Sequence, residues 1–155
     1  MLRQLDHVNI VVDDLTAMKE FYCNVLGLTV TREVTISGKW IDRTVGLTGV
    51  EAEVVYLDLK DGPRIELIHY RSPRGKTPGD LGIPNTAGLR HMAFRVDDLD
   101  AAIARLHTAG VKLFSEAQQV PDTQVTYDGG VRKRLAYFLD PENNILELCE
   151  YKAAK

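Results

Sequence analysis

The chain has 155 residues, of which 45% are hydrophobic and 26% are charged, as is typical of one globular domain with a sizeable core. The formal net charge of -3 leaves no positive excess for a nucleic-acid partner or an anionic membrane. No apolar run approaches the roughly 20 residues that span a bilayer, and the first residues carry no signal-peptide pattern. Cys23 and Cys149 are too few for a disulfide framework, so we expect reduced thiols and a cytoplasmic protein.

The first half of the chain predicts the element order β-α-β-β-β. Residues 6–12 are β-branched and mostly apolar, which favours a strand. Asp13 or Asp14 can cap a helix that begins near Leu15. Apolar residues then recur at helical spacing until Gly27, a typical residue after a helix end. The other expected elements are strands at residues 28–33, 50–59 and 64–70, with an irregular loop over residues 34–49.

Residues 71–89 contain three prolines and four glycines, and such a composition continues neither a strand nor a helix. We interpret them as a linker. After it the first half is repeated, with a strand at residues 91–96 and a helix that reaches Ala109. The remaining expected elements are a short strand at residues 111–114, a polar stretch at 115–130, a strand at 131–139, a turn at 140–144 and a strand at 145–151.

The two halves can be aligned at both of their ends. His7 in the first strand corresponds to His91, and the Asp-Asp-Leu sequence that follows each strand repeats at the same interval. Glu66 in the last strand corresponds to Glu147, and two tyrosines near them repeat at the interval of the glutamates. The two intervals are nearly equal, so the halves have nearly equal lengths, and this agreement predicts an internal duplication. We therefore expect one domain over residues 1–155, with a first module at about 4–70, the linker at 71–89 and a second module at about 90–151.

Each half opens with a histidine in its first strand and closes with a glutamate in its last. A carboxylate within a buried strand is costly unless a partner compensates its charge. If a pseudo-twofold axis relates the halves, the four side chains can converge on that axis. Two imidazoles and two carboxylates have a charge near that which balances one divalent ion. The sequence thus predicts a metal site for Ni, Co, Zn, Mn or Fe, with the ligands His7, Glu66, His91 and Glu147.

Strand alternation separates the side chains that share the ligand faces from those that point away. His69 and Glu150 lie on opposite faces from the predicted ligands, and we expect Glu150 to be a solvated or ion-paired edge residue. His107 is expected on a helix surface. The candidates for binding an anionic substrate group, chosen by facing, charge or loop position, are Asn9, Arg43, Arg64 and Arg95.

At these residues the sequence resembles the vicinal oxygen chelate superfamily, with glyoxalase I and methylmalonyl-CoA epimerase as nearest relatives. The matching stretches are LDHVNIVVDDLTAMKEFYCNVLGL, RIELIHY, LRHMAFRVDDLDAAIARLHTAGV and YFLDPENNILELCEY. The resemblance implies an α+β fold in which two βαβββ modules in tandem form a curved, cup-like mixed sheet around one divalent metal. It also implies metal ligands at the four positions above, and a homodimer.

The resemblance differs in detail between the two enzymes. The His-Glu-His-Glu set is the glyoxalase I pattern, whereas epimerases more often have Gln at the position of Glu66. Bacterial-type glyoxalase I carries an arginine four residues after the first histidine, where this sequence has Val11. In epimerases a second acid on the third strand helps to move the proton, and Glu51 and Glu53 are the candidates for that role here.

The predicted function is that of a metal-dependent lyase or isomerase. Two adjacent oxygens of a small substrate would bind the metal, which stabilises the enediolate formed when a proton is removed from carbon. A carboxylate is the natural base, so Glu66 or Glu147 is the expected catalytic residue.

Two alternatives remain open at this point. If Glu66 does not bind the metal, the other three ligands form a two-histidine, one-carboxylate triad typical of non-haem Fe(II) dioxygenases. The third possibility is a non-catalytic protein that binds a small molecule, as resistance-type members of the superfamily do. Such proteins tend to lose the metal ligands, and all four are present here.

Overall fold

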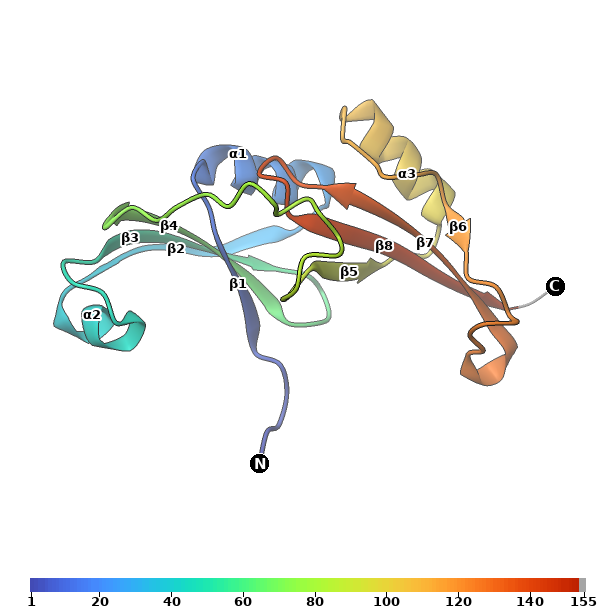
Figure 1. Ribbon diagram of the computed structural model, residues 1–155, viewed down its shortest axis with the longest axis horizontal. Coiled ribbons are helices and arrows are strands. Elements are labelled where there is room, and N and C mark those ends of the chain that lie inside the picture. The colour runs from blue at the N-terminus through green and yellow to red at the C-terminus, as the bar shows by residue number, and fades with distance from the viewer. Residues whose placement is uncertain (154–155) are drawn as a thin grey trace. The chain divides into compact units, whose positions relative to one another are not determined.

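A computed structural model describes residues 1–153 (Figure 1). The chain divides into two compact units, of which unit 1 comprises Met1–Pro78 and unit 2 begins at Gly79. Both are mixed α+β units, so the fold class expected from the sequence is confirmed. Within the described residues no helix is long and apolar enough to cross a membrane.

Unit 1 is a four-stranded mixed sheet with the strand order β1-β4-β3-β2. Strand β1 runs parallel to β4, and the other neighbours are antiparallel. Figure 1 shows α1 on one face of this sheet and α2 on the other. The elements are β1 (His7–Val11), α1 (Leu15–Glu20), a π-helical turn (Phe21–Val25), β2 (Thr29–Ser37), α2 (Lys39–Val45), β3 (Glu51–Asp58) and β4 (Arg64–Ser72).

Unit 2 repeats this topology with the order β5-β8-β7-β6. Strand β5 is parallel to β8, the other neighbours are antiparallel, and α3 packs on the sheet. The expected repetition of a β-α-β-β-β unit is thereby confirmed. The elements are β5 (His91–Arg95), α3 (Leu99–Thr108), β6 (Gln118–Gln119), a 3-10 turn (Asp128–Gly130), β7 (Val131–Leu139) and β8 (Ile145–Ala153).

The helix that follows the first strand begins in the same way in both units. The Asp14 side chain accepts a hydrogen bond of 2.9 Å from the backbone N–H of Ala17, and Asp98 accepts one of the same length from Ala101. Such caps satisfy a donor that the helix itself leaves unpaired. Of the two aspartates that could cap the first helix, the structure identifies Asp14, whereas Asp13 accepts a hydrogen bond from the Thr77 hydroxyl.

The prediction of an irregular loop over residues 34–49 was wrong. Strand β2 continues to Ser37, and α2 follows between two glycines with positive φ, Gly38 (93°) and Gly46 (71°). Glycine adopts these backbone angles without the steric penalty of a Cβ atom, so the two residues define the ends of this short helix. Asp42 fixes its exit by accepting hydrogen bonds from the backbone of Gly49 and Val50.

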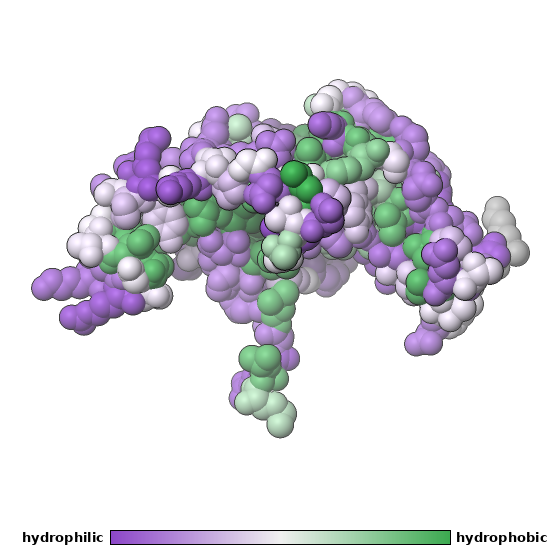
Figure 2. Space-filling model, in the orientation of Figure 1, coloured by the Kyte–Doolittle hydropathy of each residue, from purple (hydrophilic) through white to green (hydrophobic). Residues whose placement is uncertain are grey.

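Helix α2 packs on the sheet face that carries Glu66. Its Ile41 is 5% exposed and belongs to a core cluster with residues of β3 and β4, including Ala52 and Ile68. Trp40, the next residue towards the N-terminus, is 59% exposed instead. Figure 2 shows apolar surface in the region of this helix. The segment therefore covers part of the face on which the sequence places a ligand.

The predicted strand at residues 111–114 was also wrong. There Leu113 forms only an isolated bridge with Phe138, and the strand that pairs with β7 is the two-residue β6 farther along the chain. This edge element is short because the stretch that contains it is polar and exposed, so little burial supports a longer ladder.

Glu150 is 1% exposed and lies on β8, between β5 and β7, so the expected solvated or edge position was wrong, whereas the ion-paired alternative is confirmed. One carboxylate oxygen accepts a hydrogen bond of 2.9 Å from the backbone N–H of Leu99 at the start of α3. Lys152 Nζ lies 2.7 Å from the same oxygen, and Arg134 Nη1 lies 3.5 Å from the other. The network ties β8 to the helix. Burial raises the pKa of Glu150, but the bonds from Lys152 and Leu99 outweigh it and lower this pKa.

We predict that Glu150→Gln destabilises the protein by about 2 kcal/mol at pH 7, since a hydrogen bond to a buried charge is lost. A carboxylate with a lowered folded-state pKa stabilises the fold above its unfolded value and loses that effect as the pH falls. The difference between wild type and variant should therefore shrink below about pH 4. Urea denaturation of wild type and variant at pH 7 and below about pH 4 measures this difference in the free energy of unfolding.

Glu116→Gln is the control, because Glu116 is 72% exposed and its carboxylate pairs with His107 at the surface. Its free energy of unfolding should change by less than about 0.5 kcal/mol. Equal losses in the two variants would contradict the role assigned to Glu150.

Candidate functional site

Unit 1 places a histidine beside a glutamate on one sheet face. Strands β1 and β4 are parallel, and Asn9 is aligned with Glu66. His7 is two residues before Asn9 on β1, so its side chain points to the same face as that of Glu66. The distance from His7 Nε2 to Glu66 Oε2 is 3.5 Å, and the side chains are 44% and 18% exposed. The pair is thus accessible and within reach of a common ligand.

Unit 2 repeats this pair at the same register. Ala93 is aligned with Glu147, and His91 Nε2 lies 3.3 Å from Glu147 Oε2. In both units a tyrosine of the neighbouring antiparallel strand faces the glutamate, Tyr56 in unit 1 and Tyr137 in unit 2. The duplication inferred from the sequence therefore extends to the placement of the four predicted ligands.

The structure gathers the four predicted ligands as two pairs. Within residues 1–153, no group of three or more His, Cys, Asp or Glu side chains forms a metal site. Two ligands are fewer than the three or four protein ligands typical of a zinc site. The site of four ligands stays a prediction, and what the structure provides is one pair in each unit.

His7 is oriented by the residue that precedes it. Asp6 Oδ2 lies 2.8 Å from His7 Nδ1, which leaves Nε2 directed at Glu66. A carboxylate on one ring nitrogen fixes the tautomer that can bind a metal through the other nitrogen. In unit 2 the preceding residue is Arg90, and the His91 ring instead contacts Tyr137 with centroids 4.9 Å apart.

Glu147 differs from Glu66 in burial and in its partner. Its side chain is 3% exposed, and Lys133 Nζ of β7 lies 2.7 Å from its Oε1 atom. Burial lowers the pKa of Lys133, but the Glu147 carboxylate outweighs burial and raises it. Lys133 was not predicted as a site residue from the sequence. It could have been found, because the corresponding position in the first half is Ala52 and a lysine there places a charge on the face of Glu147.

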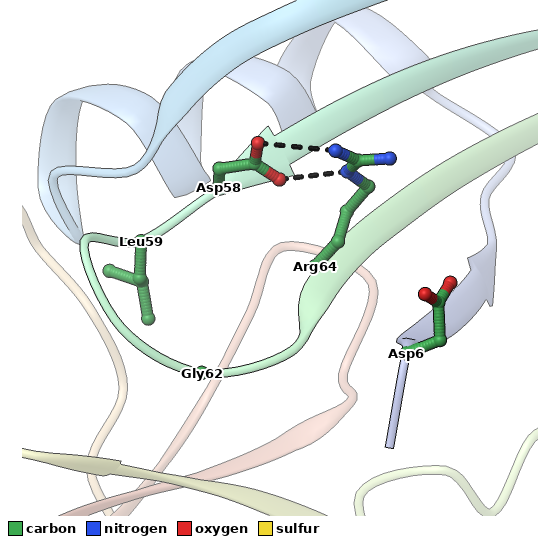
Figure 3. A pocket seen from close by; sticks show the side chains of 5 residues that line it. All are labelled: Asp6, Asp58, Leu59, Gly62 and Arg64. Carbon is green, nitrogen blue, oxygen red and sulfur yellow. Dashed lines mark hydrogen bonds and ion pairs between the residues drawn. The ribbon is translucent and has the colours of Figure 1, made fainter. Parts of the chain in front are cut away.

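Arg64, expected to bind an anionic substrate, is held by a neighbouring carboxylate. Its Nε donates a 2.8 Å hydrogen bond to Asp58, and Figure 3 shows the guanidinium turned to that residue. Arg64 lowers the pKa of Asp58 through this bond. A pocket of about 230 Å³ lies here, and its lining residues are Asp6, Asp58, Leu59, Gly62 and Arg64.

The other substrate-binding candidates lie in different places. Asn9 is exposed on β1 on the face of His7. Arg43 lies in α2 rather than in a loop, and it lines a pocket of about 340 Å³ with Lys39 and residues after the helix. Arg95 lies on β5, with its Cζ atom 5.2 Å from the centre of the Tyr151 ring. Of the four candidates, Asn9, Arg64 and Arg95 share a face with a His–Glu pair, and Arg64 is held there by Asp58.

The two acids of β3 are placed away from the pair in unit 1. Glu53 is aligned with His69, whereas Tyr56 is aligned with Glu66, so Glu53 lies on the opposite sheet face. Arg71 binds the Glu53 carboxylate at 2.7 Å and lowers its pKa. Glu51 is exposed beside a register shift at the start of the strand. Neither acid faces His7.

Two tandem βαβββ units, each with a His–Glu pair on one sheet face, define the class of vicinal oxygen chelate proteins. Residues 4–148 match the Glyoxalase/Bleomycin resistance protein/Dioxygenase superfamily, and the chain belongs to this family. The family expected from the sequence is confirmed.

Individual relatives agree with this assignment. The uncharacterized protein YaeR of Escherichia coli (strain K12) is 33% identical over 96% of this chain and 97% of that protein. The mitochondrial methylmalonyl-CoA epimerase of Bos taurus is 26% identical over 77% of this chain and 61% of that protein. The crystal structure of a glyoxalase family protein from Bacillus cereus has a TM-score of 0.80, with 28% identity and coverage of 97% of this chain and 95% of that chain.

The Lys133–Glu147 pair generates a prediction for the protein treated with a chelator. Lys133→Met leaves a buried carboxylate without its cation, so we expect a loss of roughly 3 kcal/mol in the free energy of unfolding. In a Glu147→Gln background the same change should cost much less. Denaturant unfolding of the two single variants and the double variant gives the coupling energy.

Lys112→Met serves as the control, because Lys112 is exposed and lies in the same unit. Additive effects of the Lys133 and Glu147 substitutions would show that the ion pair carries no stabilising coupling.

Proposed function

We propose that the protein is a divalent-metal-dependent lyase or isomerase that acts on a small substrate with vicinal oxygens. The observation that carries this proposal is the repeated His–Glu pair, which has the same register in both units and Nε2–Oε2 distances of 3.5 and 3.3 Å. Membership of a superfamily that includes the bovine methylmalonyl-CoA epimerase supports an isomerase-type reaction.

The residues present fit a divalent metal. Imidazole nitrogen and carboxylate oxygen suit ions such as Ni²⁺, Co²⁺, Zn²⁺, Mn²⁺ and Fe²⁺. Lys133 Nζ lies at the Oε1 atom of the buried Glu147 carboxylate, so Oε2, 3.3 Å from His91 Nε2, is the oxygen that can bind a metal together with the imidazole. Because each pair alone is too small a ligand set, we propose that His7, Glu66, His91 and Glu147 together hold one ion.

The two glutamates would have different roles. Glu147 is buried between His91 and Lys133, so its carboxylate is fixed in place. Glu66 is more exposed, and no lysine or arginine forms an ion pair with it within the described residues. It can therefore change its contacts and accept a proton from a substrate carbon. The bound metal would supply Lewis-acid stabilisation of the negative charge that develops on the substrate oxygens.

The test is exchange of a carbon-bound hydrogen with solvent deuterium. Protein that has been stripped with a chelator and reloaded with Co²⁺ is incubated with methylmalonyl-CoA in D₂O, and deuterium at the α-carbon is followed by NMR. We expect exchange that requires the metal. In Glu66→Gln it should fall by at least about 100-fold, the range that general-base catalysis contributes.

Glu51→Gln is the matched control, because Glu51 is exposed and lies away from the His7–Glu66 pair. Full exchange in Glu66→Gln would contradict the assignment of the base. Metal-dependent O₂ uptake without deuterium incorporation would instead indicate the dioxygenase reaction. The homodimer expected from the resemblance stays a prediction.

A further inference from the structure

The two units share their His–Glu pairs but differ in the charges around them. In the alignment of the halves, Arg95 takes the place of Val11, four residues after the first histidine of each half, and Lys133 takes the place of Ala52. Val11 is an exposed apolar residue, and Ala52 is fully buried. Two cations on the ligand face of unit 2 thus correspond to two apolar residues on that of unit 1.

Both cations lie at one aromatic ring. Arg95 Cζ is 5.2 Å and Lys133 Nζ is 5.8 Å from the centre of the Tyr151 ring. They come from β5 and β7, the two strands that flank β8, and so they approach the ring from both sides of its strand. A cation near an aromatic face is stabilised, and this contact limits its freedom to turn towards solvent. Tyr127 packs edge-on against the same ring, with centroids 5.4 Å apart.

These cations exceed the negative charge available to them. Glu147 pairs with Lys133, and within residues 1–153 no carboxylate forms an ion pair with Arg95. Arg64 and Arg134, by contrast, each have a carboxylate partner. Arg64 is bound by Asp58, and Arg134 is bound by Asp100. Arg95 therefore keeps its full set of guanidinium donors on the ligand face.

The geometry points to a carboxylate-binding subsite formed by Arg95 and Lys133 over Tyr151. Its ligand is a carboxylate of the substrate other than the group with vicinal oxygens. A guanidinium matches a carboxylate with two parallel hydrogen bonds, and the ammonium adds a second positive charge. This inference rests on the proposed function, in which Glu147 shares its charge with a metal and neutralises Lys133 less. The substrate class is then a small organic acid with an additional carboxylate.

The test compares two probes that differ by one carboxylate. Glycolate and tartronate both present a hydroxyl next to a carboxylate, and only tartronate has a second carboxylate. Each is titrated calorimetrically into Co²⁺-loaded protein from which excess metal has been removed. We expect wild type to prefer tartronate by at least about tenfold, as one charge-assisted pair provides.

The preference should fall to near unity in Arg95→Gln and in Lys133→Gln, and Lys133→Arg should retain most of it. Arg132→Gln is the matched control, because Arg132 precedes Lys133 on β7, points to the opposite face and pairs with Asp122. Arg95 is exposed, so Arg95→Gln should fold as the wild type does. An unchanged preference for tartronate in this variant would overturn the subsite.

The affinity for Co²⁺ alone is measured for each variant, which separates the subsite from the proposed function. If wild type binds no metal, the proposed function fails, and malonate is titrated into the metal-free protein. Malonate binding that is lost in Arg95→Gln would then support the subsite by itself. Absence of malonate binding would overturn it.

Discussion

The site depends on the parallel pairing of the first and last strands in each unit. Because β1 is aligned with β4 through Asn9 and Glu66, and β5 with β8 through Ala93 and Glu147, each histidine lies beside a glutamate on one face. A slip of one residue in either ladder would move the histidine or the glutamate to the opposite face. The caps at Asp14 and Asp98 and the buried Glu150 network fix the helices that follow the first strands. The common topology thereby produces the same pair twice.

The duplicated pairs have diverged in their surroundings. Asp6 orients His7, and α2 covers part of the face of Glu66. In unit 2 the glutamate is buried, and a lysine lies beside it. A buried carboxylate and an accessible one of the same origin suit different tasks, since the first keeps a fixed position and the second can exchange a proton. The proposed division of labour between Glu147 as an anchoring ligand and Glu66 as the base rests on this difference in burial.

The fold and both pairs could be predicted because they lie in what the two halves share. A repeat that holds at both the opening histidines and the closing glutamates fixes strand order and facing without any single strong motif. The unshared features were harder to predict. Helix α2 is seven residues long, too short for a clear helical period, and its signal was the pair of glycines around it. Strand β6 has two residues and no apolar pattern. Lys133 was not predicted because the halves were aligned by their identical residues, and at this position they differ, with Ala52 in the first half and Lys133 in the second.

The central claim is that two His–Glu pairs, one from each unit, serve a single metal ion. Metal content and affinity of the chelator-stripped protein, titrated with Co²⁺, test it in wild type, His7→Ala and His91→Ala. The account predicts one ion per chain in wild type and a loss of at least about tenfold in affinity when either histidine is removed, since each variant loses a direct ligand. Two ions per chain, or a variant of one unit that binds as tightly as wild type, would contradict it.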